Sequence, residues 1–249
     1  MAFLLGCEKV SVEFPTKTVF EGLSLGVDEG ARIGIVGQNG DGKSTLLRVL
    51  SGDVEVDDGR VIRTRGVSVG VLGQSDDLRD ADTVERAVVG DIPEYEWAGD
   101  PRVRAIIAGL LEDVDWNATV GTLSGGQRRR VDLARLLIGD WDVLMLDEPT
   151  NHLDIKYQLE IMDIVKSLDV TVIAAVHDLN IAAMYCDRLI AISGGKVAGI
   201  GTPRELLTAE FIKKLYGVDS RVDIEESTGR MNIVYLPRHW KKETPQVST

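Results

Sequence analysis

The feature that most constrains this chain is a nine-residue loop, Gly37–Thr45, with the sequence GQNGDGKST. It follows the apolar run Ile33–Val36 and precedes a leucine-rich segment that begins at Leu46. This order predicts a buried strand, a glycine loop and a helix, and the loop fits the phosphate-binding pattern G-x-x-x-x-G-K-[ST]. Glycines let the backbone wrap closely around an anion, and the helix start adds positive potential. A glycine-rich turn without a ligand is the alternative, and the match in its expected setting favours the phosphate loop.

Four side chains have definite roles if the ligand is a nucleotide. Lys43 would reach the β- and γ-phosphates, and the Ser44 hydroxyl would bind Mg²⁺, which takes few protein oxygens. Asp147 and Glu148 follow the apolar strand Val143–Leu146, so their carboxylates emerge at the edge of the sheet beside the loop. Asp147 is then placed to hold Mg²⁺, and Glu148 to orient and deprotonate a water. Ordinary strand-end charges are the alternative.

Length and composition restrict the class of protein. The 249 residues suit one large α/β domain, and 44% hydrophobic content allows a sizeable core. No run approaches the roughly 18 apolar residues of a membrane span, and the N-terminus lacks the basic region of a signal peptide, so a cytoplasmic protein is expected. Cys7 and Cys186 match no disulfide framework or metal-ligand spacing and are expected in the core. The net charge of −12 argues against a nucleic-acid surface, so no direct DNA binding is expected.

The order of apolar patterns indicates alternating strands and helices, hence a mostly parallel sheet with ligands at the carboxyl ends of its strands. Buried strands are predicted at 33–36, 143–146, 170–176 and 189–192, and helices at 43–52, 126–138 and 155–168. Short antiparallel strands are predicted around the turn residues Pro15 and Gly22, and 61–72 forms another alternating stretch.

The expected organisation is one domain over 1–237 with a helical subdomain at about 75–138, followed by a polar tail, 238–249, that frays. Within the subdomain, the acidic cluster 75–82 is interpreted as a solvated loop rather than a metal site. Toward the C-terminus, a capping box at 202–205 and a short helix at 208–216 precede a hairpin at 221–236.

A second glycine motif, Leu123–Gln127 (LSGGQ), lies downstream of the phosphate loop. Two glycines and a serine at a helix start form another anion-binding nest. A plain helix cap explains Ser124 and Gly125, but not the whole motif together with the two strand-end carboxylates. With these motifs the chain resembles the nucleotide-binding domain of ATP-binding cassette (ABC) proteins over almost its whole length.

The resemblance implies a P-loop NTPase fold, with a mostly parallel sheet, an N-terminal antiparallel β subdomain and the inserted helices. It also implies binding of ATP and Mg²⁺ and hydrolysis of ATP to ADP and phosphate in a head-to-tail homodimer. In that dimer each ATP lies between the Walker A loop of one copy and the signature motif of the other, so a monomer hydrolyses ATP poorly.

Site residues follow from the same resemblance. The residues implied to contact the nucleotide are Phe14 (stacked on adenine), Gly37, Asn39, Gly40, Gly42, Lys43, Ser44, Thr45, Ser124, Gly125, Gly126, Gln127 and Asp154. Those implied to act in catalysis are Gln74 (Q-loop), Glu148 (base) and His177 (switch histidine), and those implied to bind Mg²⁺ are Ser44, Gln74 and Asp147. The segment 151–154 matches the D-loop. A core phenylalanine is the alternative for Phe14.

Two halves of the chain resemble different ABC proteins. Residues 1 to about 154, with VGQNGDGK and LSGGQRRRVDLA, resemble the soluble ABC-F proteins, which act on ribosomes. Residues 155 to 237 resemble ATPase subunits of importers for iron complexes and vitamin B12. The single cassette and the absence of a long charged linker favour an importer subunit, whose partners are membrane permease subunits at the inner face of the membrane. A recombined or engineered hybrid with a junction near Asp154, and a module that binds ATP without hydrolysing it, are alternatives.

Overall fold

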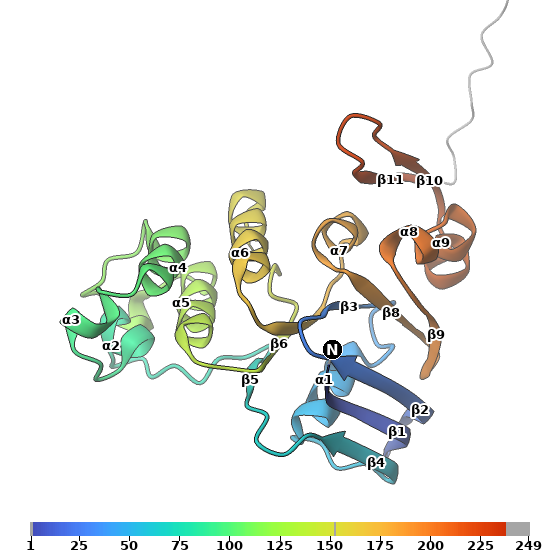
Figure 1. Ribbon diagram of the computed structural model, residues 1–249, viewed down its shortest axis with the longest axis horizontal. Coiled ribbons are helices and arrows are strands. Elements are labelled where there is room, and N and C mark those ends of the chain that lie inside the picture. The colour runs from blue at the N-terminus through green and yellow to red at the C-terminus, as the bar shows by residue number, and fades with distance from the viewer. Residues whose placement is uncertain (1, 152, 238–249) are drawn as a thin grey trace, which may run out of the picture.

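The computed structural model describes residues 2–151 and 153–237 (Figure 1). Its strands are β1 (Phe3–Phe14), β2 (Lys17–Asp28), β3 (Arg32–Val36), β4 (Asp58–Arg63), β5 (Val69–Leu72), β6 (Val143–Asp147), β7 (Thr171–Ala175), β8 (Arg188–Ser193), β9 (Lys196–Gly201), β10 (Asp219–Ile224) and β11 (Met231–Leu236). Its helices are α1 (Lys43–Ser51), α2 (Val84–Val89), α3 (Glu94–Trp97), α4 (Pro101–Leu111), α5 (Gly125–Ile138), α6 (Ile155–Ser167), α7 (Leu179–Tyr185), α8 (Pro203–Leu206) and α9 (Ala209–Tyr216), with a 3-10 turn at Val120–Thr122. The predicted tail, 238–249, and His152 of the predicted D-loop lie outside the described residues.

The central sheet has the strand order β5-β6-β7-β3-β8-β9, and only its edge strand β9 runs antiparallel to its neighbour. Every residue of β6 and β7 is buried. Such continuous apolar strands are typical of a parallel sheet with both faces covered, because neither side of the strand meets water. The predicted α/β fold with a mostly parallel core is confirmed.

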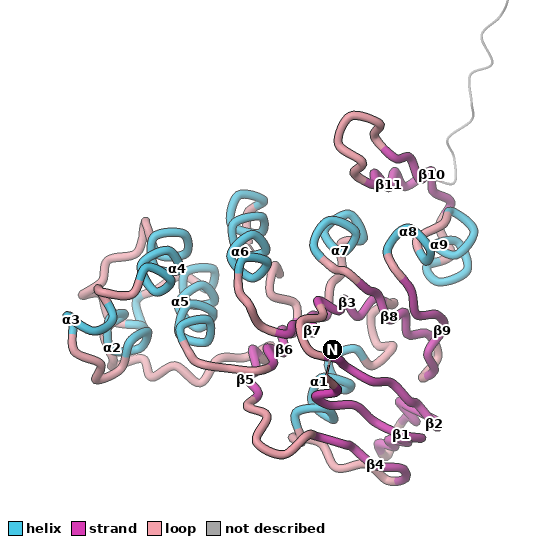
Figure 2. Tube along the Cα trace, viewed as in Figure 1, coloured by secondary structure: helices cyan, strands magenta, loops and turns pink. Residues whose placement is uncertain are grey.

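Alternate residues of β6 enter the two apolar layers that cover the sheet. Val143 and Met145 pack with α1 and the inner face of the antiparallel sheet, whose strand order is β2-β1-β4. Leu144 and Leu146 pack on the opposite layer, with residues of α5, α6 and α7. Figures 1 and 2 show α1 between the antiparallel strands and the central sheet, and α6 and α7 on the other side of that sheet. The phosphate loop therefore leads into a helix that is held between two sheets.

Two strand predictions need correction. The stretch 61–72 is not one strand, because β4 pairs antiparallel with β1 whereas β5 pairs parallel with β6. The chain changes sheets in a turn at Gly66, and the alternating pattern cannot show this because both strands share it. Gly22 lies inside β2 rather than between two short strands, since β1 and β2 stay paired through several register shifts.

The helices α2 to α5 form a group beyond β5, at the left of Figure 1. The acidic loop 75–82 joins β5 to this group and is not simply solvated. Arg128 of α5 pairs with Asp76 at 2.7 Å and with Asp80 at 2.5 Å, and Arg135 of α5 pairs with Asp77. The loop is therefore fastened to α5 by ion pairs that join residues about fifty positions apart in sequence.

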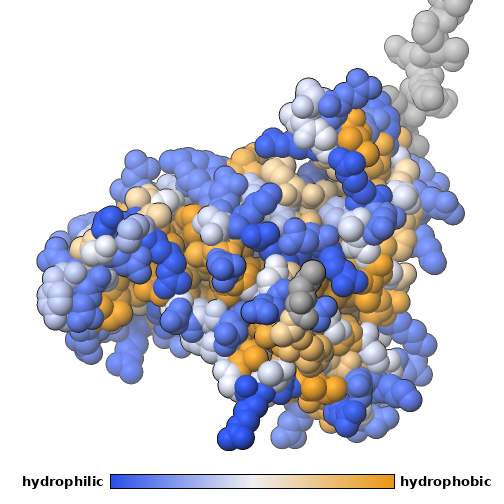
Figure 3. All heavy atoms as spheres, viewed as in Figure 1, coloured by the Kyte–Doolittle hydropathy of each residue, from blue (hydrophilic) through white to orange (hydrophobic). Residues whose placement is uncertain are grey.

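The C-terminal hairpin β10–β11 follows α9 and lies on the α7 side of the molecule (Figure 1). The face drawn in Figure 3 shows hydrophobic residues between hydrophilic ones, over the middle and the lower right of the view. Within the described residues, no helix is long and apolar enough to span a membrane.

Candidate functional site

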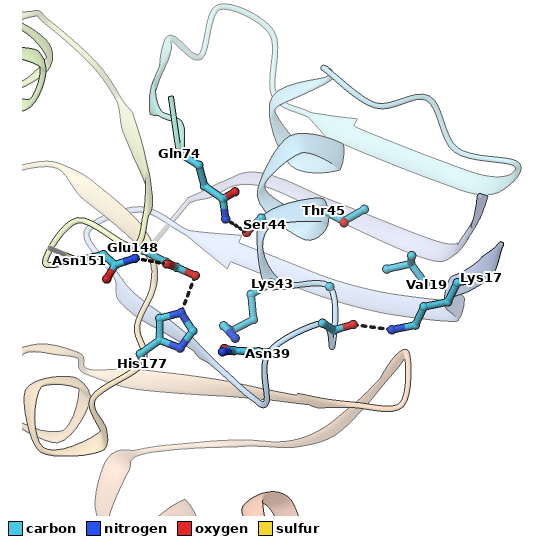
Figure 4. Close-up of a pocket in the computed structure, with 12 residues that line it drawn as sticks. Lys17, Val19, Asn39, Lys43, Ser44, Thr45, Gln74, Glu148, Asn151 and His177 are labelled. Atoms are coloured by element: carbon cyan, nitrogen blue, oxygen red, sulfur yellow. Dashed lines mark hydrogen bonds and ion pairs between the residues drawn. The ribbon is translucent and has the colours of Figure 1, made fainter. Parts of the chain in front are cut away.

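A cavity of about 700 Å³ lies over the phosphate loop (Figure 4). Three segments meet there because the carboxyl ends of β3, β6 and β7 are in register, with Ile35 and Asp147 both paired with Ala175. The residues that line it are Lys17, Val19, Asn39, Gly40, Gly42, Lys43, Ser44, Thr45, Gln74, Glu148, Asn151 and His177. The structure thus brings most of the predicted phosphate-loop residues to one cavity with Gln74, Glu148 and His177.

Lys43 is buried at the start of α1, and its ammonium is bound by the backbone of its own loop. Its Nζ donates to the carbonyl oxygens of Gly37 at 2.9 Å and Gln38 at 3.1 Å. Burial lowers the pKa of Lys43, and the nearby charges of Glu148 and Asp41 oppose that shift. The loop therefore presents a positive charge to the cavity, where a phosphate would be a stronger partner than a carbonyl.

Ser44, Asp147 and Gln74 form a hydrogen-bonded group beside Lys43. The Ser44 hydroxyl donates to Asp147 Oδ1 at 3.0 Å and accepts from Gln74 Nε2 at 3.0 Å. Burial raises the pKa of Asp147, while the bond from Ser44 opposes that rise. Across 2–151 and 153–237, no group of three or more His, Cys, Asp or Glu side chains is arranged to hold a metal. A hydroxyl, an amide and one carboxylate nevertheless fit Mg²⁺, which is usually bound by one or two carboxylates, waters and substrate phosphates.

Glu148 follows β6, and its carboxylate points toward the adjacent ring of His177 (Figure 4). Its Oε1 contacts His177 Nε2, and its Oε2 accepts from Asn151 Nδ2 at 2.8 Å. The backbone φ of Glu148 is +51°, in the left-handed region that costs a non-glycine residue about 1 to 2 kcal/mol. Strain of this kind persists only where neighbouring contacts hold it, and it is concentrated at functional sites.

Three lining residues were missed as site residues by the sequence interpretation. Lys17 begins β2, and its Nζ donates to the Gly40 carbonyl at 2.5 Å, while Val19 lines the wall beside it. Asn151 was noted only as part of a motif. Because Lys17 contacts a loop residue 23 positions away in sequence, no local pattern marks it as a site residue. Phe14 ends β1, is 43% exposed and is not among the lining residues, so its contact with adenine stays a prediction.

The signature motif lies apart from the first cavity. Ser124 caps α5, in a capping box with Gln127. Gly125 and Gly126 line a second cavity of about 420 Å³, together with Gln74, Asp76, Arg129, Asp147, Glu148 and Asn151. Asp154 occupies the N-cap position of α6 without a side-chain cap bond. A single chain therefore does not bring Ser124, Gln127 or Asp154 to its own phosphate loop, and their nucleotide contacts stay predictions.

Residues 20–151 match the family described as ABC transporter. The hemin import ATP-binding protein of Pseudomonas aeruginosa is 36% identical, over 93% of this chain and 99% of that protein. The ferric enterobactin transport ATP-binding protein of Escherichia coli is 32% identical, over 93% of each chain. The cobalamin import ATP-binding protein of Halobacterium salinarum is 33% identical, over 92% of this chain and 62% of that protein.

Solved structures agree on the fold. A chain of an ABC transporter assigned to the metal-chelate type superposes with a TM-score of 0.78 at 21% identity, over 95% of this chain and 98% of that one. The structure of cbiO1 from Clostridium perfringens, part of the ABC transporter complex cbiONQ, gives 0.68 at 27% identity, over 86% and 94%. The sequence relatives above match 92–93% of this chain, so their alignments run through the region near Asp154 and support neither the ABC-F resemblance nor the hybrid. The chain belongs to the ABC transporter family.

Proposed function

We propose that this chain is the nucleotide-binding subunit of an importer, where it binds and hydrolyses MgATP to drive transport. The observation that carries the proposal is the convergence of the phosphate loop and the Glu148–His177 pair on one cavity. Its relatives over nearly the whole chain are named as ATP-binding proteins for import of hemin and cobalamin and for transport of ferric enterobactin. These are metal chelates, so a metal-chelate substrate is the class proposed for the transporter.

The residues of the cavity have different roles in the proposed hydrolysis of ATP. Lys43 and the loop N–H groups bind the β- and γ-phosphates, replacing the carbonyls that Lys43 now contacts. Glu148 accepts the proton of the attacking water, and His177 and Asn151 hold its two carboxylate oxygens in place. Ser44, Asp147 and Gln74 are the residues that would hold Mg²⁺, which neutralises phosphate charge when bound.

The functional unit is proposed to be a head-to-tail homodimer. None of the four residues Ser124, Gly125, Gly126 and Gln127 lines the cavity over the phosphate loop of the same chain, which supports a contact with a partner's nucleotide instead. Residues 1–237 act as one ABC ATPase domain with the helical subdomain at about 75–138. Membrane permease subunits are the further partners, which places the protein at the inner face of the cell membrane.

The first test is phosphate release by the purified protein with Mg²⁺, measured against protein concentration. Activity per chain should rise with concentration, because each site needs a second copy. Glu148→Gln should keep ATP binding, stall hydrolysis by roughly 10²- to 10⁴-fold and trap the dimer. Turnover by Glu148→Gln at the parent rate would show that the base is assigned wrongly. Parent protein that binds ATP without releasing phosphate would favour a regulatory ATP-binding module.

A second test separates the importer from the ribosome-associated alternative. Tagged Glu148→Gln protein, loaded with ATP, should co-purify with permease subunits from solubilised membranes. The same protein should not co-sediment with ribosomes. ATP-dependent co-sedimentation with ribosomes that is stronger for Glu148→Gln than for the parent would contradict the importer proposal.

A further inference from the structure

Arg129 extends from the second turn of α5 to the carboxyl edge of the central sheet. Its Nη1 donates to the Gly73 carbonyl at 2.5 Å. Its Nη2 donates to the Asp147 carbonyl at 2.6 Å and, at 3.4 Å, to that of Glu148. One guanidinium therefore binds the backbone just beyond the paired parts of two neighbouring strands, β5 and β6.

The strand geometry explains why this position needs an arginine. β5 and β6 pair in parallel as far as Leu72 and Leu146, and beyond that point the two backbones separate. Partly buried carbonyls that no longer pair with the neighbouring strand need hydrogen-bond donors from elsewhere. Arginine supplies several N–H groups in a rigid planar fork that spans the two segments, whereas lysine offers one compact ammonium.

Both backbone segments lead directly to residues of the proposed site. Gly73 precedes Gln74, whose amide contacts Ser44. The other segment contains Glu148, whose left-handed φ of +51° requires support from neighbouring contacts. Arg129 supplies that support by donating to the carbonyls of Asp147 and Glu148. The N–H of Glu148 is held as well, because it donates to the Ala175 carbonyl at 3.2 Å.

Arg129 also connects this edge to the signature motif. It lies on the helix that begins at Gly125, directly after the Ser124 cap, and it lines the second cavity together with Gly125 and Gly126. The neighbouring Arg128 holds Asp76, two residues beyond Gln74, through bonds of 2.7 to 2.9 Å. A shift of α5 would therefore move the backbone of Gln74 and of Glu148 together.

We propose that Arg129 is a positioning residue for ATP hydrolysis, which fixes Glu148 and Gln74 relative to each other and links both to the signature helix. This inference rests on the proposed function, because it assigns the hydrolytic step to Glu148. The residue touches neither substrate nor metal in this role. It acts through the backbone of the two residues that do.

The test compares Arg129→Gln and Arg129→Lys with the parent in steady-state ATP hydrolysis. Both variants should lower kcat by roughly 100-fold, since a displacement of about 1 Å at a reacting group costs about that much, while KM for ATP stays within about twofold. Arg135→Gln is the matched control on the same helix, because Arg135 binds Asp77 and Asp132 and not the edge of the sheet. It should keep the parent kcat.

A double-mutant cycle gives the readout that a structural role would not produce. In a Glu148→Gln background, Arg129→Gln should lower the residual rate much less than it lowers the parent rate, because the positioned carboxylate is already gone and only the effect on Gln74 remains. Independent, multiplying losses would overturn the proposal. So would a parent-like kcat in both Arg129 variants, or a rise in KM that matches the fall in kcat. If Glu148→Gln itself hydrolyses ATP like the parent, the proposed function has failed and this inference fails with it.

Discussion

At the scale of single residues, Lys43 shows how the phosphate loop is held ready for an anion. The residue is 5% exposed, and its ammonium donates to two carbonyls of the loop, those of Gly37 and Gln38. Those neutral partners are weaker than the phosphate oxygens that would replace them. The buried charge therefore favours an anionic ligand over the loop's own backbone.

Removing this charge should weaken nucleotide binding directly. Lys43→Ala should raise the Kd for ATP by roughly 10- to 100-fold, the range expected for one or two charge-assisted hydrogen bonds. Binding of a fluorescent ATP analogue by equilibrium titration measures it. Lys196→Ala, which removes an exposed lysine paired with Glu21, is the control and should bind like the parent. Equal affinities of Lys43→Ala and the parent would contradict the assigned role.

Gly42 offers a separate test of the loop's shape. Its φ is +99°, and a Cβ there would lie 2.6 Å from Val19 and 2.9 Å from Phe20. Gly42→Ala should therefore move the start of α1, lower stability by about 1 kcal/mol or more and weaken ATP binding. Gly52, at the other end of α1, has a φ of +92° and nothing within 4 Å of a Cβ. Gly52→Ala should lose similar stability, measured by urea unfolding, and bind ATP normally, since only Gly42 adjoins the cavity.

At the scale of elements, Arg130 ties α5 to the two helices beside it. Its side chain is 4% exposed, and it donates to the Leu110 carbonyl at 2.6 Å and to both oxygens of Asp113, at 2.6 and 2.9 Å. The guanidinium also lies 3.9 Å from the ring centre of Tyr157 in α6. These contacts hold α4, α5 and α6 in one arrangement, so they set the position of the signature motif.

The Arg130–Asp113 ion pair makes part of the free energy of unfolding depend on pH in the acid range. Hydrogen bonds from Arg130 lower the pKa of Asp113 from 3.8 to about 2. As pH falls, the Asp113 carboxylate is therefore protonated in the unfolded chain before it is protonated in the folded chain. The ion pair contributes its full stability above about pH 5, and this contribution is lost as pH approaches 2. Asp113→Asn should be less stable than the parent at neutral pH, with the difference narrowing by about pH 3, in urea unfolding. A difference that is independent of pH would contradict the ion pair. The carboxyl is half exposed, so solvent weakens the effect.

The predictable elements are those whose signal is local. β3, β6, β7 and β8 were predicted because each contains a short apolar run, and the phosphate loop because its motif is contiguous. The change of sheet between β4 and β5 was not predicted, because apolar and polar residues alternate in the same way in both strands. Lys17 and Arg129 were also missed, since their contacts join residues 23 and 56 positions apart. Pairing partners of charged side chains depend on the packed fold, which the sequence pattern does not contain.

At the scale of the whole molecule, the C-terminal part of the chain contacts the phosphate loop and the segment that follows His177. Gln38 of the phosphate loop donates to the Leu215 carbonyl of α9 at 2.6 Å. Asn180, three residues after His177, accepts from the Ile233 N–H at 2.8 Å and donates to the Ile233 carbonyl at 3.3 Å. The side chain of Asn180 thus bonds to β11 as a neighbouring strand would, and it fastens the hairpin to the segment that carries His177.

Asn180→Ala should therefore loosen the hairpin while the central sheet stays intact. Loss of two partly buried hydrogen bonds should cost about 1 to 3 kcal/mol, because the Ile233 backbone groups are left without partners. Hydrogen exchange should show faster exchange for the amides of 219–236 and unchanged exchange for β6 and β7, since local opening of an edge element need not involve the core. Asn232→Ala, an exposed change on the same strand, is the matched control and should leave the hairpin protected. Uniformly faster exchange in Asn180→Ala would instead show that the hairpin and the nucleotide domain unfold as one cooperative unit.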